Sequence, residues 1–449
     1  MKQFNYLILM AFILGMAACK KDDTSGNDAV PVTITVKLAY NNETAAIGLS
    51  LEKAAVKLTN LTTNQVYNGT SATDGVATFK DIAPGNYNVS VVQTITAADY
   101  NAKAGTNVAD AIVFNGILSN QSLVTNSTLA VTLITGRVGD LVIKQIYYSG
   151  SNAANGALYR DQFLEIYNNS SETIYADSLY FGQTENTATE LGKVDLTKTY
   201  FLSGGQYDWT KSVGMSDGKA NTDYVYMHSL FMIPGTGKQH PILPGASIII
   251  AATAQNHQSP YTDISGKAIT IKDPSLTVDL SKAEFEVYLG DQNGINPLAS
   301  DVDNPNVTNV TVIDRGGVRD LIFDVLGRDG LVIFKSKVDP KTWSRYPSPD
   351  ITQVIATTNT FIQVPLNLII DGVGLNHTTE SKRVPKYMNN SVDAGEIYTL
   401  GGSYSSEAVV RKVSKTNGSR IVLKDTNNSS NDFGVKKADA TKTASSFVN

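Results

Sequence analysis

The sequence predicts an all-β chain that folds into two β-sandwiches of different size. Residues 31–92 contain short runs of alternating apolar and polar residues, separated by Gly, Pro and Asn, which is typical of strands joined by turns. No stretch of three helical turns keeps apolar residues at helical spacing without interruption by Gly, Pro or Asn. With 449 residues, of which 42% are hydrophobic, the chain is long enough to bury two cores.

The smaller sandwich is expected over residues 31–135. The run VTITVKLAY at 32–40 alternates as a half-buried strand does, and four further strands are expected at AAVKLTN, QVYNGT, VATFKDI and YNVSVV. Asp74-Gly75 and Pro84-Gly85 supply turns between them. These motifs resemble prealbumin-like or carboxypeptidase-regulatory-like domains, which usually serve as spacers. Residues 129–134 fit the last strand of such a domain, whereas residues 93–128 fit it poorly.

The larger sandwich is expected over residues 141–437 and opens with two β-type runs, LVIKQIYY and QFLEIYNN, within residues 141–169. These runs, and the later LPGASIIIA, resemble strands of lamin-tail-type, immunoglobulin-like domains. A span of roughly 300 residues exceeds the usual domain of about 100 to 150 residues. Long insertions are therefore expected near residues 184–232 and 291–390, and residues 438–449 are interpreted as a tail.

Residues 1–18 have the pattern of a signal peptide. Lys2 precedes an apolar run over residues 6–16 that is too short to span a bilayer, and two alanines then precede Cys19. Cys19 is the only cysteine, and its position matches a bacterial lipobox, in which the thiol is diacylated and becomes the mature N-terminus. Residues 19–30 are then an acylated N-terminus and linker, and the lipid anchor attaches the chain to the outer membrane.

Four charged residues directly after Cys19 indicate where the protein is displayed. Lys20, Lys21, Asp22 and Asp23 resemble the export signal that sends lipoproteins of Bacteroidota-type bacteria to the cell exterior, although a solvated tether is the alternative interpretation. Removal of residues 1–18 leaves 36 basic and 42 acidic residues, a formal charge of −6, with no basic block. A nucleic-acid partner is therefore not expected.

The sequence predicts no catalytic residue, no metal and no cofactor. His228, His240, His257 and His377 are scattered, and there is no nucleophile elbow, phosphate-binding loop or dinucleotide fingerprint. Asp301 and Asp303 lie in an oxygen-rich run that could begin a calcium loop, but the glycine and closing glutamate of an EF-hand are missing. A solvated turn is the favoured interpretation of that run.

Aromatic residues suggest a possible recognition surface. Ten of the 21 tyrosines lie between residues 147 and 226, where they are also favoured simply as strand residues. Tyr207 and Trp209 follow Ser203-Gly204-Gly205 in an expected insertion loop. We therefore take them as candidate ligand-binding residues.

The whole layout resembles an uncharacterised family of Bacteroidota-type surface lipoproteins with a prealbumin-like domain followed by a lamin-tail-like region. That resemblance implies no established activity. The leading hypothesis is a non-enzymatic binding protein that is accessory to an outer-membrane β-barrel transporter for nutrients, of the TonB-dependent type. The alternatives are a surface adhesin or structural protein, and a hydrolase whose carboxylates lie in the insertions.

Overall fold

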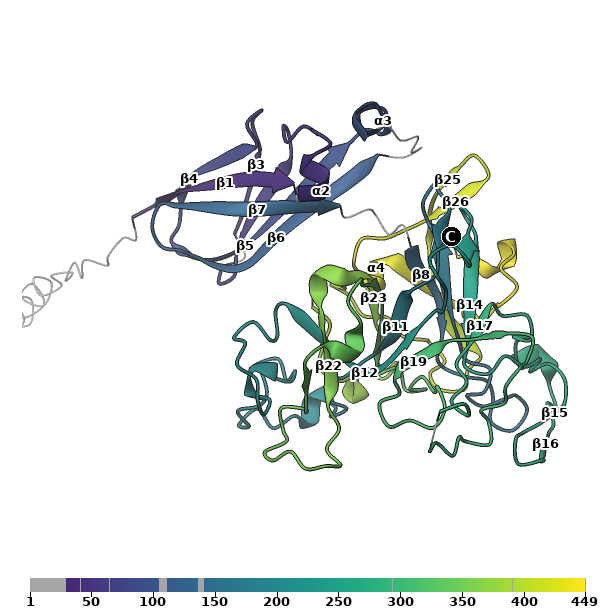
Figure 1. Cartoon of the computed structure of the whole chain (residues 1–449). Helices are drawn as coiled ribbons and strands as arrows, with labels where there is room; N and C mark the ends of the chain where they lie inside the picture. Colours follow the sequence, from purple (N-terminus) through teal and green to yellow (C-terminus); the bar gives the residue numbers. More distant parts are fainter. Residues whose placement is uncertain are drawn as a thin grey trace, which may run out of the picture. The chain divides into compact units, whose positions relative to one another are not determined.

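The computed structural model describes residues 30–40, 42–63, 65–104, 111–135, 141–292, 294–389 and 391–448. The described residues divide into two compact units, a smaller one from residues up to 94 and 114–134, and a larger one from residues 95–113 and from 135 onward. Strands are the predominant regular secondary structure in both units (Figure 1), which confirms the all-β prediction.

A single seven-stranded sheet forms the smaller unit, in the order β3-β2-β5-β6-β7-β1-β4. One face of β1 and one face of β2 are buried, because apolar and polar residues alternate along these strands. The sheet bends so that its edge strands approach each other, and Gly69 of β3 lies against the ring of Phe79 in β4, where a Cβ atom would come within 2.9 Å. The strands are β1 (Val32–Tyr40), β2 (Ala55–Asn60), β3 (Val66–Thr70), β4 (Val76–Ile82), β5 (Gly85–Ile95), β6 (Ile112–Leu123) and β7 (Ser127–Thr135), and the helices near them in the chain are α2 (Asn42–Ala45) and α3 (Ala97–Ala104).

All five strands expected over residues 31–92 are present, and β7 includes the strand expected over residues 129–134. The strand that sequence patterns did not predict is β6, which lies between β5 and β7 in the sheet. It belongs to the segment that fits the prealbumin-like pattern poorly.

Two seven-stranded sheets form the larger unit. The β8 sheet has the order β18-β17-β14-β9-β8-β24-β27, and the β12 sheet has the order β21-β22-β12-β11-β20-β23, with β19 also paired to β12. Their strands are β8 (Leu141–Tyr147), β9 (Phe163–Asn168), β14 (Ser247–Ala251), β17 (Phe285–Glu286), β18 (Thr308–Asn309), β24 (Glu407–Arg411) and β27 (Phe433–Lys437) in the first sheet, and β11 (Leu179–Thr184), β12 (Tyr224–Met232), β19 (Thr311–Asp314), β20 (Gly330–Lys335), β21 (Arg345–Tyr346), β22 (Phe361–Pro365) and β23 (Ile369–Gly374) in the second.

Short elements complete the larger unit. Three two-stranded ribbons pair β10 (Ile174–Tyr175) with β13 (Pro241–Ile242), β15 (Tyr261–Thr262) with β16 (Ala268–Ile269), and β25 (Val413–Asn417) with β26 (Arg420–Leu423). The helical turns are α4 (Ser429–Asp432), η1 (Leu191–Lys193), η2 (Trp209–Lys211), η3 (Pro274–Leu276), η4 (Pro340–Thr342), η5 (Leu366–Leu368), η6 (Glu380–Lys382) and η7 (Ala444–Ser446). None of the helices in the described ranges is long and apolar enough to cross a membrane.

The main core lies between the two sheets of the larger unit. Residues such as Ile166 of β9 and Phe181 of β11 meet there, and both are almost fully buried. Each sheet also has a second apolar cluster on its other face, around Phe163 for the β8 sheet and around Phe334 for the β12 sheet. Every residue of β8, β9 and β11 is therefore buried, including polar residues such as Lys144 and Glu165.

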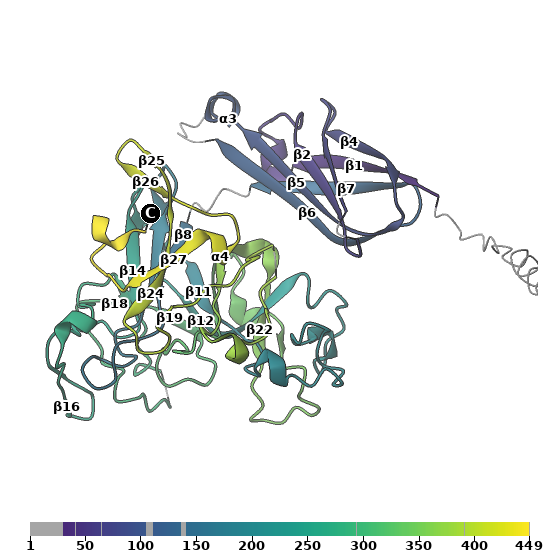
Figure 2. The same ribbon diagram turned by 180° about the vertical axis from the view of Figure 1, so that it is seen from behind.

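The ranges predicted as long insertions, residues 184–232 and 291–390, contain strands of the sandwich as well as long loops. These ranges contain β12, β20, β22 and β23, which make up most of the β12 sheet. The strands of the β12 sheet form one half of the sandwich. They are separated by long loops and pair over long sequence distances. In Figure 2, β8, β24 and β27 lie side by side in the same way, although more than 250 residues separate the first two.

Candidate functional site

A buried ion pair lies on the face of the β8 sheet that points away from the main core. Lys144 Nζ is 2.9 Å from Glu165 Oε1, and both side chains are almost completely buried. A β-bulge at Lys144 turns the following Gln145 to the same side, where its Nε2 donates to Glu165 Oε2 at 3.1 Å. Burial lowers the pKa of Lys144, while the Glu165 carboxylate opposes that shift. Both carboxylate oxygens of Glu165 therefore accept from buried donors, and Glu165 compensates the buried polar groups on this face.

The C-terminal strap, residues 438–448, covers this ion pair. Lys144 Nζ donates to Ser446 Oγ at 2.7 Å and lies 3.9 Å from the centre of the Phe447 ring. Gln145 forms two hydrogen bonds with the backbone of Asp439, at 2.9 and 3.1 Å. The boundary predicted at residue 437 is therefore corrected, since the strap is part of the folded unit.

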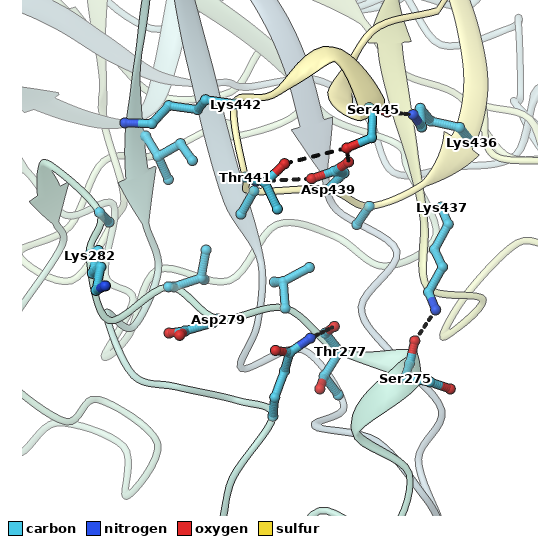
Figure 3. A pocket seen from close by; sticks show the side chains of 17 residues that line it. Ser275, Thr277, Asp279, Lys282, Lys436, Lys437, Asp439, Thr441, Lys442 and Ser445 are labelled. Carbon is cyan, nitrogen blue, oxygen red and sulfur yellow. Dashed lines mark hydrogen bonds between the residues drawn. The ribbon is translucent and has the colours of Figure 1, made fainter.

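A groove of about 850 Å³ opens beside the strap (Figure 3). Residues 275–283 form one wall, residues 436–445 form the other, and Ile249 of β14 lies between them. Six lining residues are aliphatic, namely Ile249, Val278, Leu280, Ala283, Ala438 and Ala440. They belong to the apolar cluster on this face of the β8 sheet. The groove is the candidate binding site, because it combines an apolar lining with charged groups.

Four lysines surround the groove: Lys282 on one wall, and Lys436, Lys437 and Lys442 on the other. Lys437 donates to the carbonyl of Ser275 across the groove, and Lys436 donates to the carbonyl of Ser445. Lys442 pairs with Glu284, whose other carboxylate oxygen accepts from the backbone of Ile249 at 2.9 Å. Two carboxylates also line the groove, those of Asp279 and Asp439.

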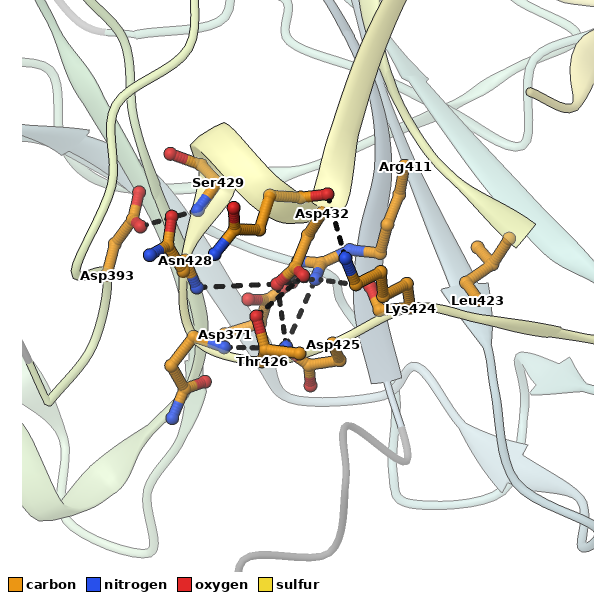
Figure 4. A network of polar contacts seen from close by, with 12 residues as sticks. Asp371, Asp393, Arg411, Leu423, Lys424, Asp425, Thr426, Asn428, Ser429 and Asp432 are labelled. Atoms are coloured by element: carbon orange, nitrogen blue, oxygen red, sulfur yellow. Dashed lines mark hydrogen bonds and ion pairs between the residues drawn. The ribbon is translucent and has the colours of Figure 1, made fainter. Parts of the chain in front are cut away.

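A second polar cluster surrounds Arg411 of β24, and it has a structural role (Figure 4). Arg411 Nη2 lies 2.5 Å from Asp371 of β23 in the opposite sheet, and Nη1 lies 3.1 Å from Asp425 and 3.6 Å from Asp432. Asp371 also accepts from the backbone of Ile143 at 2.7 Å. The cluster thus joins the two sheets, and Arg411, Asp371 and Asp432 are buried.

The structure does not assemble a calcium site from Asp301 and Asp303. Asp301 accepts from the backbone of Leu289 at 3.0 Å, and Asp303 accepts from the side chain of Asn309 at 3.0 Å. Burial raises the pKa of Asp301 to about 7, which disfavours the charged form that a cation needs. Within the ranges that the structure describes, no group of three or more His, Cys, Asp or Glu side chains could hold a metal ion.

The four histidines make separate local contacts. His228 Nδ1 lies 2.8 Å from Glu185, which raises its pKa, and His377 Nδ1 accepts from the backbone of Thr379 at 2.8 Å. His257 is fully buried, with its Nε2 on the carbonyl of Thr253, and burial lowers its pKa to about 4. The ring of His240 packs edge-on against Phe285. Each ring has a packing or hydrogen-bonding role.

The candidate recognition residues Tyr207 and Trp209 lie in the core of a lobe outside the β12 sheet. Trp209 is only 7% exposed and stacks on Tyr226 with ring centres 3.6 Å apart, while Tyr207 is half-buried next to it. Trp209 is therefore part of the lobe core, and the ligand-binding role of Tyr207 and Trp209 stays a prediction. Asp208 caps the turn by accepting from the backbone of Thr210, which fixes the ring inward.

The residues predicted to anchor and export the protein, Cys19, Lys20, Lys21, Asp22 and Asp23, lie outside the described residues. Their roles stay predictions. The groove lysines were missed by sequence reasoning, because Lys282 and the strap-side lysines are more than 150 residues apart and form no local motif. The adjacent Lys436-Lys437 pair was the one local signal.

Comparison with known proteins shows similarity to a family of unknown function. The model of a family described as a protein of unknown function, DUF4876, matches residues 243–440. The larger unit resembles the DUF4876 family. The crystal structure of a DUF4876 family protein from Bacteroides thetaiotaomicron is 25% identical, covers 90% of this chain and 95% of that chain, and has a TM-score of 0.50. The DUF4876 match includes both walls of the groove as far as Ala440.

More distant structures share little of the arrangement. A proposed adhesin from Bacteroides ovatus is 9% identical over 37% of this chain and 57% of its own, with a TM-score of 0.18. A DUF3823 family protein from Parabacteroides merdae is 10% identical over 35% of this chain and 67% of its own, with a TM-score of 0.15. Neither likeness is close enough to support a conclusion. Comparison with curated proteins gives no match.

Proposed function

We propose that this chain is a lipid-anchored protein of the outer membrane, displayed on the cell exterior, that binds a ligand or partner and catalyses no reaction. The proposed setting is an accessory role beside an outer-membrane β-barrel transporter for nutrients. The observation that carries the binding role is the lysine-lined groove on the larger unit. Anchoring and export rest on Cys19 and on the charged residues Lys20 to Asp23.

The buried titratable groups of the larger unit support a non-enzymatic role. Lys144, Glu165 and Arg411 are engaged in ion pairs and hydrogen bonds that hold the sheets and the strap in place. A general acid or base must reach a substrate. In the described contacts, these three side chains are directed at protein partners. The groove by contrast offers charge and apolar surface together, which is the composition of a binding site.

Affinity purification from gently solubilised outer membranes tests the accessory role. A stoichiometric β-barrel transporter that co-purifies with the tagged chain, identified by mass spectrometry, is the expected result. Purification of the chain alone would contradict the accessory role and favour an adhesin, for which binding to host or bacterial surface glycans would then be measured.

Replacement of Cys19 tests the anchor. The variant Cys19→Ala has no thiol to acylate, so the protein should leave the membrane fraction. A matched change, Ser25→Ala in the linker, should leave membrane association unchanged. Retention of the Cys19→Ala protein in membranes would overturn the lipid-anchor proposal.

A further inference from the structure

The groove has an excess of positive charge on a chain that is acidic as a whole. The full chain has a formal net charge of −5, yet four lysines and only two carboxylates line the groove. Asp439, one of the two, accepts from the Ser445 hydroxyl at 2.6 Å and from the backbone of Thr441 at 2.9 Å, so its carboxylate is held within the strap. With Glu284, which pairs with Lys442, four lysines face three carboxylates, and the excess of one positive charge favours an anion.

The lysines keep donor capacity for a ligand. Lys437 donates to the neutral carbonyl of Ser275, so no carboxylate cancels its charge in that contact. Lys436 donates to the carbonyl of Ser445 and also interacts electrostatically with Asp439. Lys282 is exposed on the opposite wall and has no hydrogen-bond or ion-pair partner in the described part of the chain. An ammonium has three donors, and one contact leaves the others available.

The centre of the groove is aliphatic. Val278, Leu280 and Ala283 come from one wall, and Ala438 and Ala440 come from the other, with Ile249 between them. Figure 3 shows the labelled lysines at the periphery of this apolar centre. Burial of an alkyl group there is worth about 0.8 kcal/mol per CH₂.

From this arrangement we propose that the groove binds a small amphipathic anion, an alkyl chain with a carboxylate or phosphate headgroup. The headgroup contacts Lys282 and the lysines of the opposite wall, and the alkyl part lies on the aliphatic centre. The volume of about 850 Å³ falls within the range of small-molecule sites, about 300 to 1,000 Å³. Among the residues that the structure describes, no aromatic ring lines the groove, so a neutral sugar would have no ring to stack on there. This inference specifies the ligand class of the proposed binding protein and rests on that function.

Calorimetric titration with decanoate tests the proposal on the full chain carrying Cys19→Ala, in which no attached acyl group can compete. Decanoate should bind, and its affinity should fall with added salt because the lysines are near the surface. Acetate has the charge without the chain, and decyl maltoside has the chain without the charge, so each should bind at least about tenfold more weakly. Equal binding of decyl maltoside and decanoate would overturn the proposal.

Variants of Lys282 assign the headgroup contact. Lys282→Ala should weaken decanoate binding about fivefold, whereas Lys282→Arg should keep it within about twofold. Lys238→Ala is the matched control, because Lys238 is also exposed on the larger unit but lies outside the groove. Ala283→Phe, which fills the apolar centre, should abolish binding while the melting temperature is retained. Unchanged affinity in both Lys282→Ala and Ala283→Phe would place decanoate elsewhere and refute the site.

Decyl phosphate distinguishes the two possible sources of the headgroup. Tighter binding of decyl phosphate than of decanoate would support a phospholipid-type ligand, and the reverse would support a fatty acid. Failure of both amphiphiles to bind, with a transporter still co-purifying from membranes, would remove this inference and leave the proposed accessory function standing. Binding of decanoate by a chain that co-purifies with no transporter would support this inference and contradict the proposed accessory function.

Discussion

The two units use similar strand-forming residues but bury them in different ways. In the smaller unit, β1 alternates between buried and more accessible positions, whereas all six residues of β9 in the larger unit are buried. The difference arises because the β8 sheet is covered on both faces, by the β12 sheet on one side and by the strap and residues 275–283 on the other. The period of a strand therefore reports how many of its faces are covered.

Two-sided burial also explains where the buried charges occur. A polar side chain on an outer face is solvated in the smaller unit, but in the larger unit it must find a protein partner. Lys144 and Glu165 pair under the strap, and Arg411 pairs with Asp371 between the sheets. The following variants test this contrast.

The largest effect is expected for Arg411→Ala. It should lose about 3 to 5 kcal/mol of unfolding free energy, because Asp371, Asp425 and Asp432 would lose their buried counter-charge. Both tryptophans belong to the larger unit, so tryptophan fluorescence in denaturant follows this unit alone. Lys219→Ala is the control, since it removes an exposed pair with Asp223 and should cost less than about 1 kcal/mol. Similar losses in the two variants would contradict a structural role for Arg411.

A smaller loss is expected for Phe163→Ala, on the strap side of the β8 sheet. Phe163 is fully buried and packs on Tyr147 with ring centres 5.8 Å apart, so the change should cost about 3 kcal/mol. The counterpart in the smaller unit is Thr78→Ala, at an exposed position of β4, which should change stability by less than about 0.5 kcal/mol. Scanning calorimetry measures both. A loss below about 1 kcal/mol in Phe163→Ala would show that this face is not a second core.

The stability of the larger unit should decrease as the pH rises from about 4 to about 7. Burial raises the pKa of Asp161, Glu286 and Asp320 to about 7. An acid whose pKa is higher in the folded state binds its proton more tightly there, so its stabilising contribution is present below about pH 4 and is lost as the pH approaches 7. Asp161→Asn should reduce the change by about 1 to 3 kcal/mol, measured by denaturant unfolding at several pH values.

The control for the pH effect is Asp74→Asn, which changes an exposed residue of the smaller unit. It should leave the pH dependence of the tryptophan-monitored transition as it is in the parent protein. If Asp161→Asn behaves in the same way as this control, burial of Asp161 is not a source of the pH dependence.

The smallest effect is expected for Lys57→Glu in the smaller unit. Lys57 is exposed on β2, between the buried Val56 and Leu58. Reversal of its charge should change the unfolding free energy by less than about 0.5 kcal/mol, and the melting temperature should therefore change little. Circular dichroism of the melting transition measures this. A large loss would show that the outer face of this sheet is covered, as it is in the larger unit.

Local sequence patterns were sufficient for the strands and insufficient for their partners. Alternation and turn residues located the strands over residues 31–92, and the runs in residues 141–169 formed β8 and β9 as expected. The β12 sheet was missed, because β12 pairs with β11, β19 and β22. The residues paired with β12 lie up to about 140 positions away from it in the chain. Short strands between long loops carry too little local signal to be distinguished from insertions.

Burial explains why the groove, and not the segment around Tyr207 and Trp209, is the candidate binding site. Tyr207 and Trp209 have the composition of a recognition loop, but the same aromatic residues also make a good lobe core, in which Trp209 stacks on Tyr226. The groove was not visible in the sequence, because its lysines and aliphatic residues come from β14, from residues 275–283, from the end of β27 and from the strap.

The sequence by itself determined the all-β class, most strand positions of the smaller unit and the signals expected at residues 1–23, because these depend on neighbours within a few residues. The tertiary structure decided which faces are covered, that residues 438–448 belong to the fold, and that Lys282 faces Lys436 and Lys437 across a groove. These features arise from contacts between segments far apart in the chain, whose register no local pattern specifies.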